Sequence, residues 1–78
     1  MNNEQRKICR AVDFFAEKMK TTMLGKYEDG YREWDCDDYT DIIRHKLTKN
    51  LMEDDFVDVA NFAMMLDGFK VKRPGQND

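Results

Sequence analysis

The sequence predicts an all-α protein of three helices, in which an N-terminal helix is followed by a helical hairpin. Apolar residues recur at spacings of three and four from Ile8 to Met23, which is the period of one helix face. No proline or glycine lies between Tyr31 and Asp67, so no residue there breaks a helix. Residues 56–66 are apolar in almost every direction around a helix, which is typical of a helix buried in a bundle.

The first helix is expected to run from the N-terminus to about Leu24. Asn2 or Asn3 can cap its first turn, and Glu4 then lies where the helix dipole favours a negative charge. Gly25 is expected to end the helix, because glycine readily adopts the left-handed conformation found after the last helical turn.

Residues 26–37 are expected to form a loop, with a turn signal at Asp29-Gly30. Aromatic side chains recur in this loop at spacings of four and three: Tyr27, Tyr31 and Trp34. They are suited either to close over a core or to stack on a nucleobase, and packing in the core is the simpler interpretation.

Residues 38–67 allow two arrangements, one long helix or a hairpin. We favour a hairpin broken near Asn50, because asparagine is the next-best residue after glycine at a left-handed helix end. Asp37 or Asp38 is expected to cap the second helix.

The third helix is expected to begin at the acidic residues 53–55, where the helix dipole favours negative charge, and to end at Gly68. The remaining residues 69–78 are mostly polar and are expected to form a flexible tail. The domain organisation predicted is therefore a single all-α domain over residues 1–68.

Composition limits the classes of partner. The chain has 78 residues, of which 37% are charged, and a net charge of −3. A chain this small and polar can bury little apolar area, so we expect a homo-oligomer whose subunits complete the bundle. The negative charge argues against general nucleic-acid binding, which needs a basic face. No apolar run is long enough to span a membrane.

Charge and cysteine usage add two expectations. Residues 28–41 have a net charge of −6, with a single basic residue among seven acidic ones. Such a block can steer a charged ligand or cover a basic surface, although a solvated face is the commoner reason for it. Cys9 and Cys36 follow no secretion signal, so we expect reduced thiols and a cytoplasmic protein.

Asp55, Asp58 and Asn61 recur every three residues and therefore share one stripe of the third helix. Two carboxylates at this spacing can share a hard cation such as Mg²⁺, which prefers oxygen ligands. The alternative is an ordinary acidic helix start, favoured by the helix dipole. This alternative accounts for Asp55 better than for Asp58 and Asn61, and both interpretations stay open.

The segment from Asp58 to Met65 (DVANFAMM) closely resembles the last core helix of short, phage-type MazG-like proteins. Residues 15–19 (FAEKM), Met23-Leu24 and the Gly30 to Trp34 loop also resemble the N-terminal part of that family. The family consists of all-α nucleoside triphosphate pyrophosphohydrolases, which bind Mg²⁺ through two acidic pairs on adjacent helices. The resemblance thus implies an all-α fold, oligomerisation and a Mg²⁺–nucleotide site.

Carried over residue by residue, the second acidic pair falls on Asp55 and Asp58, with Asn61 one turn later. The first acidic pair is degenerate, because the corresponding helix offers Asp41 as a third metal ligand and then basic residues. Two of these, Arg44 and Lys46, are expected near phosphate. Trp34 and Asn61 are expected to contact the nucleotide.

Few acidic groups then remain to orient a water molecule for hydrolysis. The resemblance therefore implies a nucleotide-binding protein with at most weak conversion of a triphosphate to a monophosphate and pyrophosphate. The alternative is a catalytically inactive, phage-type interaction or anti-defence protein. Such a protein would bind a host protein or sequester a signalling nucleotide in the host cytoplasm.

Overall fold

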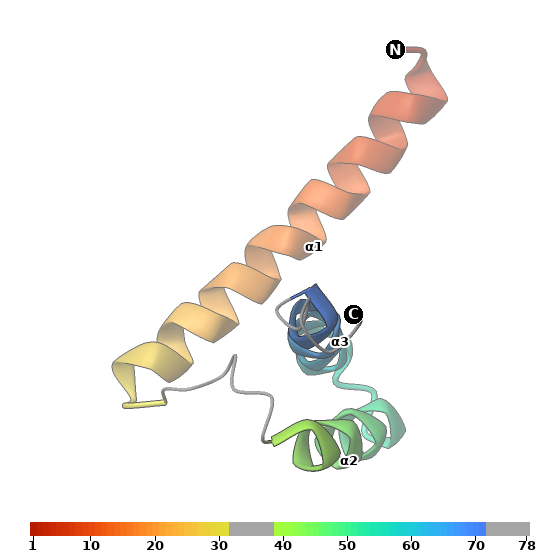
Figure 1. Cartoon of the computed structure of the whole chain (residues 1–78). Coiled ribbons are helices and arrows are strands. Elements are labelled where there is room, and N and C mark those ends of the chain that lie inside the picture. Colours follow the sequence, from red (N-terminus) through yellow and green to blue (C-terminus); the bar gives the residue numbers. More distant parts are fainter. Residues whose placement is uncertain (32–38, 72–78) are drawn as a thin grey trace.

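The computed structural model describes residues 1–31 and 39–71, with side chains up to Gly68. This part of the chain is all-helical, as predicted, and its elements are α1 (Asn3–Glu28), α2 (Thr40–Met52) and α3 (Phe56–Val71). α2 and α3 form the expected hairpin, and α1 is a long straight helix that packs on α3 (Figure 1). α3 therefore makes the principal contacts with both other helices.

The start of α1 agrees with the sequence. Asn2 occupies the N-cap, where its side-chain oxygen accepts a hydrogen bond of 2.8 Å from the Gln5 amide. The Gln5 side chain accepts a reciprocal bond of 2.8 Å from the Asn2 amide. This capping box satisfies two amides that no helical carbonyl can reach.

The predicted end of α1 at Gly25 is wrong, because the helix continues to Glu28. Gly30 is the residue that ends it, with a φ of 96°. The Gly30 amide donates to the Tyr27 carbonyl at 3.0 Å, and the Tyr31 amide to the Lys26 carbonyl at 2.9 Å. These two bonds form a Schellman motif, in which glycine supplies the left-handed residue. The Asp29-Gly30 turn signal was therefore the better guide.

The hairpin break is confirmed, but Asn50 is not its left-handed residue. Asp54 holds that position, with a φ of 59°. The Asp54 amide donates to the Leu51 carbonyl at 3.2 Å, and the Asp55 amide to the Asn50 carbonyl at 2.9 Å. The end of α2 thus repeats the Schellman motif without a glycine, because aspartate tolerates a left-handed backbone better than most residues do.

The remaining helix ends differ slightly from expectation. Tyr39 occupies the N-cap of α2 and makes no capping side-chain bond, while Asp37 and Asp38 lie outside the described residues. α3 continues past the expected end at Gly68 to Val71. The division into a domain and a flexible tail stays a prediction, since residues 72–78 are not described.

The core of the described chain is small. Its buried apolar side chains are Ile43 from α2 and Phe62 and Met65 from α3. Met23 of α1 packs against them, together with Leu47 and Leu66. Only the second half of α1 takes part, because every residue from Met1 to Phe14 is exposed.

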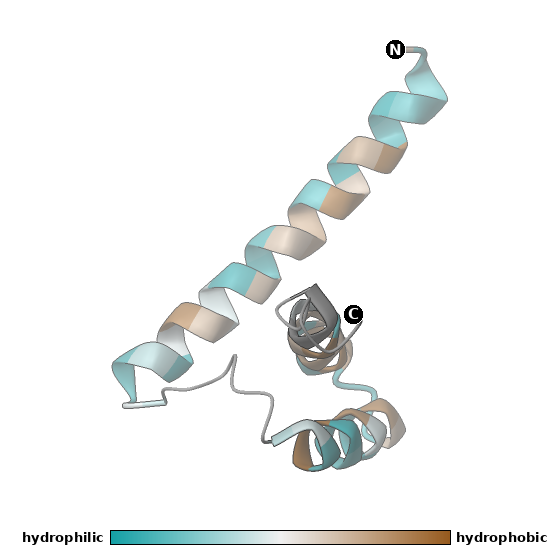
Figure 2. Ribbon diagram, in the orientation of Figure 1, coloured by the Kyte–Doolittle hydropathy of each residue, from teal (hydrophilic) through white to brown (hydrophobic). Residues whose placement is uncertain are grey.

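This exposed first half, residues 3–14 of α1, is here called the α1 arm. It extends away from the hairpin and carries patches of hydrophobic residues along its length (Figure 2). Ile8 is 57% exposed and Val12 is 61% exposed. No helix in the described ranges is long and apolar enough to cross a membrane.

Candidate functional site

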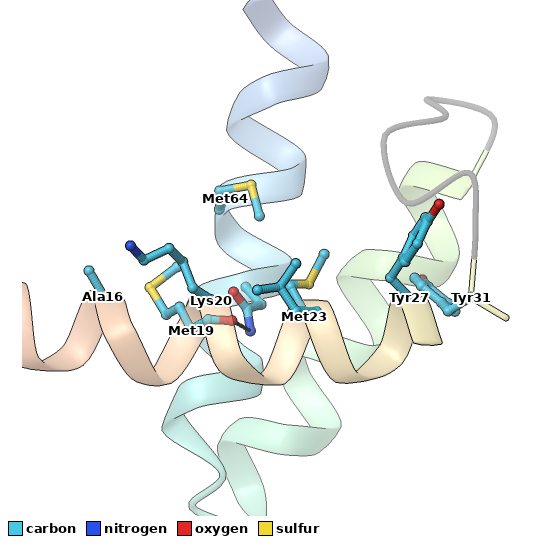
Figure 3. A pocket seen from close by; sticks show the side chains of 9 residues that line it. Ala16, Met19, Lys20, Met23, Tyr27, Tyr31 and Met64 are labelled. Carbon is cyan, nitrogen blue, oxygen red and sulfur yellow. Dashed lines mark hydrogen bonds between the residues drawn. The ribbon is translucent and has the colours of Figure 1, made fainter. Parts of the chain in front are cut away.

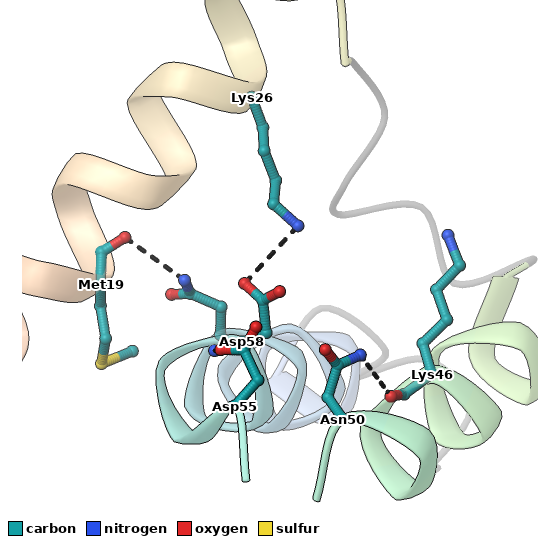
Figure 4. Close-up of polar contacts among 7 residues, drawn as sticks. Met19, Lys26, Lys46, Asn50, Asp55 and Asp58 are labelled. Carbon is teal, nitrogen blue, oxygen red and sulfur yellow. Dashed lines mark hydrogen bonds and ion pairs between the residues drawn. The ribbon is translucent and has the colours of Figure 1, made fainter. Parts of the chain in front are cut away.

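The predicted stripe of Asp55, Asp58 and Asn61 lies at the start of α3, on the side that faces α1 (Figure 4). Asp55 directly precedes the helix and caps it, since its side-chain oxygen accepts a bond of 3.2 Å from the Asp58 amide. This bond accounts for Asp55 as a structural residue and leaves its second carboxylate oxygen available.

Asp58 reaches across to α1. Its carboxylate lies 3.7 Å from the ammonium of Lys26, and both side chains are partly buried. The same ammonium lies 5.4 Å from the centre of the Phe62 ring and 6.0 Å from that of Tyr31. Lys26 is therefore held among a carboxylate and two aromatic faces, each of which favours a cation.

Asn61 is 1% exposed and forms the second link to α1. Its amide nitrogen donates a bond of 3.3 Å to the Met19 carbonyl. Its side-chain oxygen is buried and accepts no hydrogen bond from the described residues. An unpaired buried carbonyl costs free energy, about 1–3 kcal/mol, so a donor supplied by a ligand would be favoured there.

A cavity of about 410 Å³ adjoins this amide, between α1 and α3. That volume falls in the range of small-molecule sites. Its wall is mainly apolar and includes methionines from both helices and two tyrosines at one end (Figure 3). The lining residues are Ala16, Met19, Lys20, Met23, Leu24, Tyr27, Tyr31, Asn61 and Met64.

Lys20 gives the cavity a cationic rim. Its ammonium lies 2.9 Å from the Glu17 carboxylate, one turn back on α1. The hydrogen bond to Glu17 and the attraction of that negative charge raise the pKa of Lys20 above its ordinary value. Lys20 is therefore protonated at neutral pH, and an anionic ligand at the rim would compete with Glu17 for its ammonium.

The other predicted site residues are more dispersed. Within residues 1–31 and 39–71, no three acidic, histidine or cysteine side chains come together as a metal-binding group. Asp41 therefore does not join Asp55 and Asp58 in one cluster. Arg44 and Lys46 are exposed on α2, and Trp34 lies outside the described residues.

Sequence reasoning missed Lys20 and Lys26 as site residues. Lys26 was assigned to a loop because Gly25 was taken as the end of the helix. With α1 extended to Glu28, Lys26 lies one turn after Thr22 and Met23, on the face that packs against α3. A signal for this was present, since Met19, Met23 and Tyr27 continue the helical spacing across Gly25.

Comparison with known proteins adds no further constraint. The sequence matches no family model, no curated protein and no solved structure.

Proposed function

We propose that this chain binds a nucleotide together with Mg²⁺, with the base in the cavity and the phosphates toward Asp58. The observation that carries the proposal is Asn61, whose buried, unpaired oxygen lies at the cavity one helical turn from an acidic pair. An apolar wall with two tyrosines suits a planar ring, and a ring N–H group would satisfy the Asn61 oxygen.

The acidic pair fits one Mg²⁺ ion in its chemistry, because Mg²⁺ commonly takes one or two carboxylates and completes its shell with phosphate and water. Asp58 already has a cationic partner in Lys26. Binding Mg²⁺ at Asp58 would therefore release the Lys26 ammonium, which could then contact the phosphates. After this exchange every charge still has a partner of opposite sign. Lys26 would then contact phosphate, which is the role that the sequence analysis expected of Arg44 and Lys46.

Any turnover would convert a nucleoside triphosphate and water to a monophosphate and pyrophosphate. Asp41 is separate from the acidic pair, so no described carboxylate is available as a third ligand. We therefore propose binding as the principal activity and hydrolysis as weak.

Isothermal titration with a panel of nucleotides, with and without Mg²⁺, tests the proposal. We expect Mg²⁺-dependent binding that Asp58→Asn weakens at least tenfold. Asp67→Asn is the matched control, because Asp67 is an exposed aspartate further along the same helix. Circular dichroism of both variants shows whether the fold survives. Absence of binding to every nucleotide, by a folded wild-type protein at high concentration, would remove the proposal.

A second candidate function is that of an interaction or anti-defence protein that binds a host protein. The exposed apolar residues of the α1 arm favour it, because monomeric proteins rarely expose contiguous apolar surface without a partner. Half of the acidic block that first motivated this function, residues 32–38, lies outside the described residues. A pull-down from a host lysate tests whether the acidic block binds a host protein. The wild type is compared with an Asp35→Asn/Asp37→Asn/Asp38→Asn variant, which should lose the partner.

A further inference from the structure

The orientation of the Asn61 amide is fixed by α1. Its nitrogen donates a hydrogen bond of 3.3 Å to the Met19 carbonyl (Figure 4). If the amide were turned over, its oxygen would face that carbonyl oxygen, and the bond would be lost because neither atom can donate. The other end of the amide is therefore always the oxygen, which is buried and accepts no hydrogen bond from the described residues. A ligand that meets this oxygen must supply a donor.

We propose that the Asn61 oxygen makes the cavity selective for nucleotides whose base carries an amino group, adenine or cytosine, over those with a carbonyl at the same position, hypoxanthine or uracil. This inference rests on the proposed function, because it names the class of nucleotide bound. In adenine and cytosine the amino group lies at the end of the base remote from the sugar. It can therefore reach Asn61 while the phosphates extend toward Asp58.

A carbonyl at that position would be repelled, because two oxygens would then meet with no proton between them. Hypoxanthine and uracil also carry a ring N–H group, which could donate to Asn61 after a small shift of the base. That N–H group lies beside one carbonyl in hypoxanthine and between two in uracil. The shift would press a carbonyl oxygen against the cavity wall, and an unpaired buried oxygen is costly. An amino group projects beyond the ring, so adenine and cytosine avoid this cost.

The cavity wall near Asn61 offers little to a displaced carbonyl. Among the other lining side chains, donors are carried by Lys20 and by the two tyrosines. The Lys20 ammonium is bonded to Glu17 at 2.9 Å, and both side chains are mostly exposed. The tyrosine nearer in the chain, Tyr27, lies two helical turns beyond Met19, roughly 12 Å along the axis of α1. A carbonyl oxygen beside the Asn61 amide would therefore stay unpaired.

Access to the Asn61 oxygen requires a movement of the wall. Asn61 is only 1% exposed, so a base reaches its oxygen after a neighbouring side chain shifts. Met19, Met23 and Met64 line the cavity, and methionine is unbranched with three rotatable bonds, which lets it repack around a planar ring. The free energy of this shift is the same for an amino base and a carbonyl base of equal size. It lowers the affinity for both and leaves their ratio to Asn61.

The first test compares matched nucleotides by isothermal titration of the full chain in the presence of Mg²⁺. Adenosine and inosine triphosphates share their sugar, phosphates and ring size, as do cytidine and uridine triphosphates. We expect the amino member of each pair to bind at least tenfold more tightly. Purine riboside triphosphate has a hydrogen in place of the amino group of adenine. It should bind at least fivefold more weakly than adenosine triphosphate, because it leaves the Asn61 oxygen unpaired.

The second test assigns the selectivity to Asn61. Asn61→Leu removes the acceptor with little change in size and should reduce the preference for adenosine over inosine triphosphate at least fivefold. Asn50→Leu is the matched control, because the Asn50 amide also donates to a helix carbonyl, that of Lys46 at 2.7 Å, but does not line the cavity. It should leave the preference unchanged. Circular dichroism shows whether each variant folds, and the wild-type comparison decides the selectivity if Asn61→Leu does not.

The outcomes separate this inference from the function on which it rests. Equal affinity of the wild type for adenosine and inosine triphosphates would overturn the selectivity and leave nucleotide binding in place. A preference that a folded Asn61→Leu variant retains would also overturn it, since another group would then recognise the base. Absence of binding to all five nucleotides would remove the proposed function, and this inference with it.

Discussion

The two halves of α1 differ in surroundings far more than in sequence pattern. Both carry apolar residues at helical spacing, yet Met23 packs into the core and Ile8 is 57% exposed. The second half also holds two polar links to α3, from the Met19 carbonyl to Asn61 and from Lys26 to Asp58. The comparison teaches that periodicity identifies the face of a helix that needs cover, but not the segment that covers it.

The largest expected effect is the difference in stability between a substitution in the core, beneath the second half of α1, and one in the α1 arm. Met65→Ala should lower the free energy of unfolding by about 2–5 kcal/mol, since Met65 is fully buried in a core with few other members. Ile8→Ala should change it by less than about 0.5 kcal/mol in dilute, monomeric protein, because the side chain is exposed. Urea denaturation followed by circular dichroism measures both.

The comparison of halves would fail if Ile8→Ala destabilised the dilute protein as strongly as Met65→Ala. That result would mean that the arm is covered within a single copy of the chain. Repeating the denaturation at high protein concentration sharpens the test, because only an arm buried between copies should then make Ile8→Ala costly.

The sequence predicted the helices better than it predicted their ends. Apolar spacing was sufficient for three helices and a hairpin, because local periodicity is preserved in the fold. Gly25 and Gly68 were taken as helix ends, yet both lie inside helices. A helical glycine costs only about 1 kcal/mol relative to alanine, which the contacts made by Lys26 beyond Gly25 can offset.

The candidate site was predictable only in part, for a different reason. The sequence placed Asp55, Asp58 and Asn61 on one helix stripe because that depends on spacing alone. The Lys26–Asp58 pair and the Asn61–Met19 bond join residues far apart in the chain, and they exist only because α1 crosses α3. The cavity depends on the same crossing, so no local pattern could have located it.

The next prediction contrasts Gly25, which lies inside α1, with Gly30, which lies just beyond its end. Gly30→Ala should destabilise the protein by about 1–2 kcal/mol, because Gly30 has a φ of 96° and alanine is strained there. Gly25→Ala should instead stabilise it by about 0.5–1 kcal/mol, since Gly25 is helical and a methyl group there meets no atom within 4 Å. Thermal denaturation of the two variants checks both signs, and equal effects would contradict the assigned end of α1.

The smallest expected effect concerns the Lys20–Glu17 pair at the edge of the cavity. The pKa of Lys20 is raised in the folded protein by its bond to Glu17, so the folded state holds this proton more tightly than the unfolded state does. Any stabilisation from the pair is therefore complete below the unfolded lysine pKa and is lost as the pH rises through the folded pKa, above about pH 10. Both side chains are mostly exposed, so the effect should be close to the limit of detection and should weaken with salt.

Glu17→Gln removes the charge of the partner and leaves the cavity wall intact. The melting temperature of this variant should be slightly lower than that of the wild type. The difference should be constant from about pH 6 to about pH 9 and should vanish at higher pH. A deficit that grew with pH instead would mean that Glu17 stabilises the fold through a contact other than the Lys20 ammonium. In either case Glu17→Gln removes the negative charge beside Lys20, so it should strengthen the attraction of an anionic ligand to the cavity rim.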